Sequence, residues 1–290
     1  MNKCKRFRDL VDHPEILLMP CCYDSLSAKV FESIGFKAIG AAGYGVTGSC
    51  LGKPDIGLLS GMELVNQYKN ICASVDIPVF VDIDTGYGDV NNVIRIVQEV
   101  EKIGAAGLFI EDQKWPKRCG HMDGKEVVAV EEYIPKLKAA LWARKNPDFV
   151  IMARTDAASV LGVDEAVMRA KLYCKAGADM LFVEALDNVE DMKKVNNVLK
   201  ELNKPSMANM VEGGKTPLIK SSDLNKYGYS LVAYPCSAVY TAVKALSQMG
   251  ENLLKNGSTE NSQNTMLNFD EYNKFIGLDH IRNRERLFFE

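Results

Sequence analysis

Residues 117–122 (KRCGHM) place two cations, a thiol and an imidazole within six positions, beside a glycine. Neighbouring cations lower the pKa of a cysteine, and a cysteine with a lowered pKa exchanges protons readily near neutral pH. Cys119 is therefore a candidate catalytic acid or base. The alternative is that Cys119 is a small apolar residue packed beneath a loop, a common role of free cysteines. The segment on its own favours neither.

Carboxylates follow several apolar segments of this chain. Asp82 and Asp84 end one such segment, and Glu111 ends the next along the sequence. An acid at the edge of an apolar core is costly unless it is paired or bound to a metal. Carboxylate oxygens are the ligands that Mg²⁺ selects, with Mn²⁺ as an alternative, and the sequence has no His or Cys pair typical of zinc. Together the three acids predict a magnesium site, although each alone could cap a helix or pair with a cation.

The elements that must position these residues alternate regularly. Eight short apolar segments are typical of buried strands: residues 16–21, 38–42, 78–84, 107–112, 149–155, 180–185, 206–210 and 231–235. Apolar residues at helical spacing between them predict helices at residues 25–35, 61–75, 90–104, 131–145 and 163–177. Apolar strands that alternate with helices indicate a parallel sheet covered on both faces. Eight such units predict an α/β fold, a closed (β/α)8 barrel of the TIM type, with an open doubly wound sheet as the alternative.

The barrel prediction also explains where the polar residues fall. Such barrels carry their chemistry at the ends of the strands, and Arg154 and Glu184 end two of the later apolar segments. We assign residues 1–257, which contain no linker, to the barrel domain. Residues 258–265 are polar, and apolar residues resume at Phe269. We therefore predict that residues 258–290 form a helical appendage of the same domain that packs on a neighbouring subunit.

Composition narrows the classes of partner and compartment. The formal net charge is −3 and the sequence lacks the clustered basic face that nucleic-acid binding needs. No apolar stretch approaches the roughly 18 residues of a membrane span. Residues 1–10 are basic but have no apolar signal-peptide core behind them. We therefore expect a cytoplasmic protein that binds neither nucleic acid nor membrane and whose eight cysteines stay reduced.

Several motifs of this chain resemble those of the isocitrate lyase and phosphoenolpyruvate mutase superfamily. They are residues 51–55 (LGKPD), 81–88 (VDIDTGYG), 111–113 (EDQ), 117–121 (KRCGH) and 147–156 (PDFVIMARTD), in the family's order between about Pro20 and Met249. The resemblance is to the lyase branch, whose members cleave 2,3-dimethylmalate or 2-methylisocitrate. It implies a magnesium-dependent barrel that binds an α-keto or α-hydroxy carboxylate, commonly as a homotetramer in which a C-terminal helix packs on a neighbouring barrel.

The resemblance also implies how these residues would cleave the C2–C3 bond of a 2-hydroxy dicarboxylate. Cys119 is expected to protonate the leaving carbanion, and Arg154 to bind a substrate carboxylate with its planar guanidinium. His121 and Glu184 are expected to position the loop and the second carboxylate. The substrate-contacting residues implied are Ala42, Gly43, Tyr44, Asp82, Gly120, Arg154, Asn209 and Glu212. The metal ligands implied are Asp82, Asp84, Glu111 and, through water, Asp55.

Residues 113–126, which we call the lid, form a long connection with two glycines between a predicted strand and its helix. Connections of that kind often act as lids over an active site. Closure would bring Cys119 to the substrate and exclude the water that could intercept a carbanion. For His121 the alternative role is a hydrogen bond that only anchors the lid.

The choice of substrate depends on the end of the seventh predicted strand. Residues 209–214 (NMVEGG) include apolar Met210 and Val211, where tricarboxylate-cleaving relatives carry hydroxyl residues. This favours a methylated dicarboxylate, so we predict cleavage of 2,3-dimethylmalate to pyruvate and propionate. The alternative is 2-methylisocitrate, which would give pyruvate and succinate.

Other reactions of the family are less favoured by the sequence. Pro235 disfavours oxaloacetate hydrolysis because similar hydrolases carry a serine near that position, and the intact KRCGH segment disfavours a phosphonate substrate. Gly40 stands where some relatives have a tyrosine that handles the hydroxyl proton, with Tyr44 as a substitute, so the general base is unassigned. The alternative of a different class is a non-catalytic barrel that binds keto acids, although every implied metal ligand and acid is present.

Overall fold

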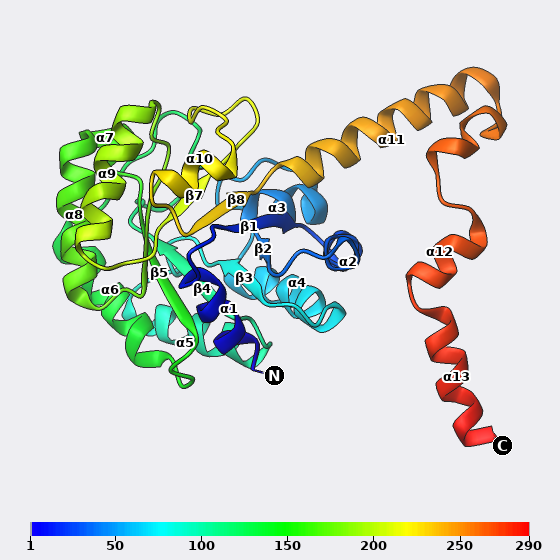
Figure 1. Cartoon of the computed structure of the whole chain (residues 1–290), viewed down its shortest axis with the longest axis horizontal. Helices are drawn as coiled ribbons and strands as arrows, with labels where there is room; N and C mark the ends of the chain where they lie inside the picture. The colour runs from blue at the N-terminus through cyan, green and yellow to red at the C-terminus, as the bar shows by residue number, and fades with distance from the viewer. Residues whose placement is uncertain (1, 290) are drawn as a thin grey trace. The chain divides into compact units, whose positions relative to one another are not determined.

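Figure 1 shows the computed structural model of the chain, which describes residues 2–289. The chain consists of two compact units, Met1–Val239 and Tyr240–Glu290. Within the described residues, no helix is both long enough and apolar enough to cross a membrane. All eight cysteines are free thiols, as the sequence predicts.

The first unit is an eight-stranded parallel barrel with helices around it (Figure 1). The strands pair in the order β6-β5-β4-β3-β2-β1-β8-β7, and a parallel bridge between Leu181 and Ser206 brings the start of β7 to β6. The predicted barrel of the TIM type is therefore confirmed, and the open doubly wound sheet is wrong. The strands are β1 (Leu17–Cys22), β2 (Ile39–Ala41), β3 (Val79–Asp82), β4 (Gly107–Glu111), β5 (Val150–Thr155), β6 (Met180–Val183), β7 (Met207–Asn209) and β8 (Leu231–Tyr234).

The helices of the first unit begin and end at residues with clear local signals. Asp24 Oδ1 accepts the N–H of Ser27 at 2.7 Å and so caps α2, which ends at Gly35 with a left-handed φ of 102°. All five predicted helices are confirmed, as α2, α4, α5, α6 and α8. The helices are α1 (Lys3–Val11), α2 (Ser25–Ile34), α3 (Gly43–Leu51), α4 (Gly61–Ser74), α5 (Val90–Lys102), α6 (Val130–Ala143), α7 (Ala158–Leu161), α8 (Val163–Ala176), α9 (Val189–Glu201) and α10 (Ser221–Lys226).

The barrel interior is filled from the end where the strands begin. Phe7 of α1 is fully buried and stacks on Phe80 of β3, with 5.0 Å between ring centroids. Phe7 belongs to the same buried cluster as Leu17 and Leu231, which are the first residues of β1 and β8. Because this end is packed with apolar side chains, the opposite end, where the strands finish, is left to carry polar groups.

The second unit is helical and exposes large apolar side chains. It contains most of α11 (Ser237–Asn256), the 3₁₀ helix η1 (Glu260–Thr265), α12 (Phe269–Phe275) and α13 (Leu278–Phe289). The helical character predicted for residues 258–290 is thus confirmed. The exposed apolar side chains of this unit include Leu254, Leu267, Phe269, Leu287 and Phe288. That this segment is an appendage of the barrel domain which packs on a neighbouring subunit stays a prediction.

Candidate active site

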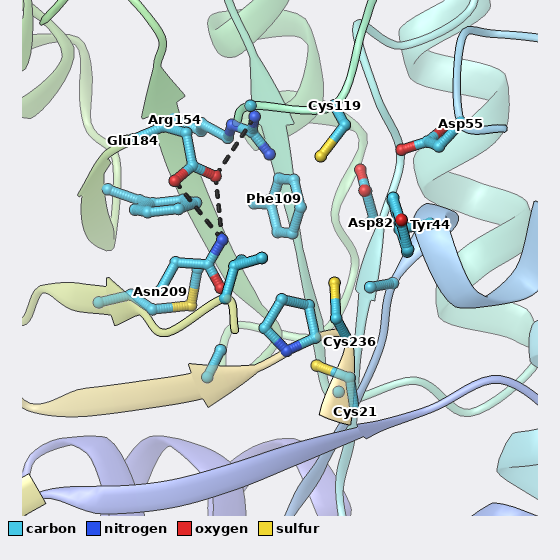
Figure 2. Close-up of a pocket in the computed structure, with 18 of the residues that line it drawn as sticks. Cys21, Tyr44, Asp55, Asp82, Phe109, Cys119, Arg154, Glu184, Asn209 and Cys236 are labelled. Carbon is cyan, nitrogen blue, oxygen red and sulfur yellow. Dashed lines mark hydrogen bonds and ion pairs between the residues drawn. The ribbon is translucent and has the colours of Figure 1, made fainter. Parts of the chain in front are cut away.

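A single cavity gathers most of the residues that the sequence predicts to be functional, at the end of the barrel where the strands finish (Figure 2). Predicted residues that line it are Ala42, Tyr44, Asp55, Asp82, Cys119, Gly120, His121, Arg154, Glu184 and Asn209. Gly43, Asp84 and Glu111 do not line the cavity but lie next to residues that do. Glu212 instead accepts a hydrogen bond from the Ser237 hydroxyl and is not part of the cavity wall.

Asp82 and Asp84 are held in place by the chain around them. The backbone N–H of Asp84 donates to Asp82 Oδ1 at 2.8 Å, and the Tyr87 hydroxyl donates to Asp84 Oδ2 at 2.9 Å. The Tyr68 hydroxyl donates to the backbone carbonyl of Asp82 at 2.9 Å. Asp84 has a left-handed φ of 47°, a conformation that aspartate tolerates better than most residues. The orientation of both carboxylates is therefore built into the end of β3.

Lys117 of the lid is buried among these acids. Its Nζ lies 2.6 Å from Asp55 Oδ1 and 2.7 Å from Asp84 Oδ1. Burial acts to lower the pKa of Lys117, but the negative charges of Asp84 and Asp55 outweigh it and raise the pKa. The lysine is therefore charged and ties the lid to the barrel. From the sequence alone, Lys117 is visible only as a neighbour of Cys119.

The acids at this end of the barrel have the type of ligand atom that a divalent cation selects. Burial, and then the charge of Asp84, raises the pKa of Asp82 to about 7, and burial raises the pKa of Glu111 despite the nearby Arg154. Among the described residues, none gives a hydrogen bond to the buried Glu111 Oε1. Raised pKa values and an unpaired carboxylate oxygen both indicate too little positive charge, which an oxygen-ligated Mg²⁺ would supply.

The side chains of the predicted metal ligands do not surround a common point. Across residues 2–289, no three His, Cys, Asp or Glu side chains are arranged so as to hold a metal ion as they stand. The Lys117 ammonium lies between Asp55 and Asp84 instead. The ligand set of Asp55, Asp82, Asp84 and Glu111 therefore stays a prediction.

Arg154, in β5, is surrounded by three carboxylates. Its Nε and Nη2 donate to the two carboxylate oxygens of Asp156 at 2.9 and 3.1 Å. Nη1 lies 3.3 Å from Glu111 Oε2, and Nη2 lies 3.4 Å from Glu184 Oε2. The Nε side of the guanidinium is thus occupied by Asp156. The edge formed by Nη1 and Nη2 has longer contacts, and it is the edge that can bind a substrate carboxylate.

Aromatic rings support the flat face of the same guanidinium. Arg154 Cζ lies 5.6 Å from the ring centroid of Phe109 and 5.3 Å from that of Phe182. Both rings line the cavity, and a cation over an aromatic face is attracted to it. Sequence reasoning missed these two residues, because an aromatic residue inside a buried strand looks like ordinary core.

Glu184 is the centre of a second polar group, which follows β6. Asn209 Nδ2 donates to Glu184 Oε2 at 3.1 Å (Figure 2). His121 Nδ1 accepts the backbone N–H of Lys215 at 2.9 Å, so a neutral ring carries its proton on Nε2, which lies 3.3 Å from Glu184 Oε1. Burial acts to raise the pKa of Glu184, but Arg154 and His121 outweigh it and lower the pKa. These contacts agree with the positioning roles predicted for His121 and Glu184.

The lid backbone lies directly against the charged residues at Gly120. A Cβ atom at this position would be 2.6 Å from Arg154 Nη2 and would also overlap Glu184. On the other side of the lid, Lys125 Nζ donates to the Gly120 carbonyl and, at 2.8 Å, to Asp156 Oδ1. The lid is therefore closed over the cavity, and glycine is the residue that permits this close approach.

Cys119 has a different environment from the one its sequence neighbours predict. Lys117 is bound to acids, and Arg118 is directed to the carbonyl of Asp123, to which its Nη1 donates at 3.1 Å. Burial raises the pKa of Cys119 to about 11, although the backbone N–H of His121 acts to lower it. The expectation that the two cations lower this pKa is therefore wrong. Cys119 is a protonated thiol at neutral pH, which is the form a proton donor needs.

The segment after β2 forms helix α3, which the sequence did not predict. Its three glycines, at positions 43, 45 and 48, weaken the helical signal. Ala42 is the N-cap, and a Cβ atom on Gly43 would lie 3.4 Å from Asp82 Oδ2. The first turn of α3 therefore runs directly beside the acids, as expected for the backbone near Ala42, Gly43 and Tyr44.

The absence of a side chain at Gly40 leaves room for the side chain of Cys21. A Cβ atom on Gly40 would lie 2.5 Å from Cys21 Sγ and 3.3 Å from Met19 Cε. Cys21 lines the cavity (Figure 2), so it fills the space beside Gly40. A tyrosine at position 40 would have to displace it.

The residues that line the cavity just after β7 and β8 are largely apolar, but not entirely as predicted. Val211 lines the cavity together with Ala233 and Pro235. Met210 is fully buried outside the cavity wall, and its sulfur accepts the N–H of Ile219 at 3.4 Å. Of the predicted apolar pair, Val211 is therefore the residue that faces the cavity.

Comparisons with known proteins place the chain in a family. The family model described as phosphoenolpyruvate phosphomutase matches residues 7–254. The 2,3-dimethylmalate lyase of Eubacterium barkeri is 42% identical over 285 residues, which are 98% of each chain. The 2-methylisocitrate lyase of Aeropyrum pernix is 37% identical over 278 residues, which are 96% of this chain and 88% of that one.

Solved structures give the same result. A crystal structure of 2,3-dimethylmalate lyase superposes with a TM-score of 0.92 at 31% identity and covers 99% of this chain and 95% of its own. A structure of phosphonopyruvate hydrolase with oxalate and Mg²⁺ has a TM-score of 0.89 at 27% identity and covers 100% of both chains. The closed lid over a charged end of a parallel barrel, together with these matches, shows that the chain belongs to the phosphoenolpyruvate mutase and isocitrate lyase superfamily.

Proposed function

We propose that this chain is a magnesium-dependent carbon–carbon lyase that cleaves 2,3-dimethylmalate to pyruvate and propionate. The observation that carries the proposal is the place of Cys119, on a lid closed over a cavity that both charged and apolar side chains line. Arg154 and Glu184 are among the charged lining residues, and Val211 and Pro235 are among the apolar ones. A dicarboxylate with methyl groups matches both kinds of residue.

The relatives support the same choice of substrate class. A lyase that acts on 2,3-dimethylmalate is 42% identical to this chain over almost its whole length. The side chains of Val211, Ala233 and Pro235 offer no hydrogen-bond donor to a further carboxylate, such as the one that distinguishes 2-methylisocitrate from 2,3-dimethylmalate. A buried carboxylate without a partner is strongly disfavoured, so the smaller substrate is favoured.

In the proposed reaction, the hydroxyl proton passes to a base and from it to solvent, C2 becomes the carbonyl carbon of pyruvate, and the electrons of the C2–C3 bond remain on C3. The neighbouring carboxylate of the substrate stabilises the resulting carbanion. The Cys119 thiol then gives its proton to C3 and forms propionate, and the thiolate regains a proton from solvent. A positioned acid of this kind typically contributes about 100- to 10,000-fold to the rate.

The remaining residues bind and orient the substrate in this proposal. The Nη1–Nη2 edge of Arg154 binds the carboxylate of the pyruvate half. Asn209 and Glu184 form a hydrogen-bonded pair beside the second carboxylate. The lid excludes water from the carbanion, since the Gly120 backbone lies against Glu184 and Arg154.

A metal ion completes the proposed site. Asp82, Asp84 and Glu111 would hold Mg²⁺, with Asp55 acting through water. When bound, Mg²⁺ supplies Lewis-acid polarisation of the substrate hydroxyl and carboxylate. The oxalate and Mg²⁺ complex of a structural relative supports this choice of ion.

We also propose that the protein works in the cytoplasm as a homotetramer, in which residues 258–290 pack on the barrel of a neighbouring subunit. The eight free thiols suit a reducing compartment. Exposed side chains such as Leu254, Phe269 and Phe288 give the second unit an apolar surface that another subunit could cover. Light scattering should report the mass of four chains, and a monomer at micromolar concentration would contradict this assembly.

A substrate panel tests the proposed reaction. Pyruvate release would be measured with 2,3-dimethylmalate, 2-methylmalate, 2-methylisocitrate, oxaloacetate and phosphonopyruvate, and oxalate release would also be measured with oxaloacetate, each with Mg²⁺ and with EDTA. We expect the highest kcat/KM for 2,3-dimethylmalate and loss of activity in EDTA. A preference for 2-methylisocitrate would contradict the substrate assignment, and binding without turnover of any compound would indicate a non-catalytic barrel.

A further inference from the structure

Lys125 is a buried cation of the lid to which the proposed reaction assigns no role. Its side chain is 2% exposed, and Nζ donates both to the Gly120 carbonyl and, at 2.8 Å, to Asp156 Oδ1. Taking an ammonium group out of water is costly, and the cost is offset only when its partners are well placed. Lys125 therefore ties one particular position of the lid to the end of β5.

Asp156 links Lys125 to Arg154. Its Oδ1 accepts from Lys125 Nζ at 2.8 Å and from Arg154 Nη2 at 3.1 Å, and its Oδ2 accepts from Arg154 Nε at 2.9 Å. The backbone N–H of Asp156 donates to Asp112 Oδ1 at 2.9 Å, so the residue is also anchored from behind. One fully buried carboxylate is thus shared between a cation of the lid and a cation of the barrel.

The anchor behind Asp156 is itself rigid. Asp112 is fully buried, and its Oδ2 accepts the hydroxyls of Thr155 and Tyr173 at 2.6 and 2.8 Å and Arg169 Nη1 at 3.0 Å. With its backbone fixed by this network, Asp156 has little freedom except in the direction of its carboxylate. Lys125 and Arg154 are the two cations that set that direction.

Building on the proposed function, we infer that Lys125 is a positioning residue, which acts through Asp156 to aim the Nη1–Nη2 edge of Arg154 at the substrate carboxylate when the lid is closed. The inference deepens the proposed function, because it couples closure of the lid to recognition of the carboxylate. The same ammonium holds the Gly120 carbonyl, and Gly120 lies between Cys119 and His121 in the chain. The contacts of Lys125 with the Gly120 carbonyl and with Asp156 therefore link lid closure to substrate orientation.

Loss of the Lys125 charge would change its contact with Asp156 and its contact with the Gly120 carbonyl. Asp156 would keep Arg154 as its cationic partner and would draw the guanidinium away from the cavity. The Gly120 carbonyl would lose the ammonium that holds the lid backbone against Glu184 and Arg154. Both changes would weaken binding of a carboxylate in the cavity.

The test uses oxalate, a small dicarboxylate, as the ligand of the magnesium-loaded full-length protein. Lys125→Met removes the charge at similar length, and Lys125→Arg keeps a charge. Lys114→Met is the matched control, because Lys114 is an exposed lid lysine paired with exposed Glu126. Titration calorimetry would give the Kd of oxalate, and steady-state assays of the preferred substrate would give kcat and KM separately.

A misplaced binding group typically costs about 100-fold, so we expect Lys125→Met to weaken oxalate binding by at least about 10-fold and to lower kcat as well. Lys125→Arg should recover most of the loss, and Lys114→Met should match the wild type. Lys125→Met made in an Arg154→Gln background should cause a clearly smaller further loss of oxalate affinity, because only the part of the effect that acts through the Gly120 carbonyl remains. Equal losses in the two backgrounds would overturn the inference.

Unfolding would not obscure the result. If Lys125→Met does not fold, Lys125→Gln, which keeps a donor for the Gly120 carbonyl but no charge, gives the same comparison. Unchanged oxalate affinity in a folded, uncharged variant would overturn the inference whatever the substrate is. Wild-type protein that binds oxalate yet cleaves nothing in the substrate panel would instead contradict the proposed function, and the oxalate comparison would still decide the role of Lys125.

Discussion

The ammonium group of Lys117 lies 2.7 Å from Asp84 Oδ1 and so joins the lid to the acids at the end of β3. Lys117 also contacts Asp55, and its side chain is 3% exposed. A lid lysine thus supplies positive charge to residues that are predicted to hold Mg²⁺. We therefore expect closing of the lid and binding of Mg²⁺ to be coupled through these charges.

Lys117→Met should strengthen Mg²⁺ binding in the absence of substrate. The substitution removes a cation that competes for Asp55 and Asp84, and at such short range charge effects are large even in a partly polar interior. We expect the Kd of Mg²⁺, measured by calorimetry, to fall by at least about threefold. Lys114→Met, which removes an exposed lid lysine, should leave the Kd unchanged, and weaker binding by Lys117→Met would contradict the competition.

Gly120→Ala should prevent the lid from closing without unfolding the protein. The added Cβ would lie 2.6 Å from Arg154 Nη2, so the lid would have to move away from the cavity. Because positioning of the acid is lost, we expect kcat to fall by at least about 100-fold while circular dichroism still shows a folded protein. Gly48→Ala is the control, since a Cβ atom added there would meet no described atom within 4 Å outside the backbone of its own helix. A normal kcat for Gly120→Ala would show that close approach of the lid is not needed.

The Cys119 thiol should react slowly at neutral pH. Burial raises its pKa to about 11, so the reactive thiolate is scarce below that pH and becomes more abundant as pH rises. In EDTA at pH 7.5, iodoacetamide should modify Cys119 about 100-fold more slowly than an exposed thiol of ordinary pKa near 8.5. Mass spectrometry of the Cys119 peptide across pH 7 to 10 should show a rate that rises about tenfold per unit. A rate already constant above pH 7 would mean that the cations do lower this pKa.

Val211→Thr should impair the methylated substrate specifically. The change keeps the size of the side chain but places a hydroxyl among the apolar side chains that line the cavity. We expect kcat/KM for 2,3-dimethylmalate to fall by about 10-fold, in the range typical of a changed contact in a hydrophobic pocket. Val243→Thr, at an exposed position of α11, should have no effect. An equal rate for the two variants would remove Val211 from substrate selection.

The strands of the barrel were predictable because each is buried over nearly its whole length. Runs such as Val150–Thr155 are buried on both faces, which distinguishes a parallel sheet from an amphipathic one. Helix α3 was not predictable in the same way, since Gly43, Gly45 and Gly48 lower its helical propensity. Packing of α3 against the rest of the barrel overrides its low helical propensity. The spacing of apolar residues in the sequence does not reveal such packing.

The fold predicts which residues lie together in the site, but it does not predict which cation pairs with which acid. Once strands are parallel, residues at their ends must meet, so Asp82, Arg154 and Glu184 were expected together. Which cation meets which acid depends on the path of the lid. Lys117 is close to Cys119 in sequence, yet its charge lies at Asp55 and Asp84.

Deuterium incorporation tests the proposed chemistry most directly. Wild-type protein with Mg²⁺ and 2,3-dimethylmalate in D₂O would be followed by NMR, beside Cys119→Ser. The account predicts equimolar pyruvate and propionate from the wild type, with one deuterium at C2 of propionate. Cys119→Ser should form product at least about 100-fold more slowly, because its hydroxyl is a much weaker acid, and should still bind oxalate. Absence of cleavage by the wild type, or an unchanged rate in Cys119→Ser, would contradict the account.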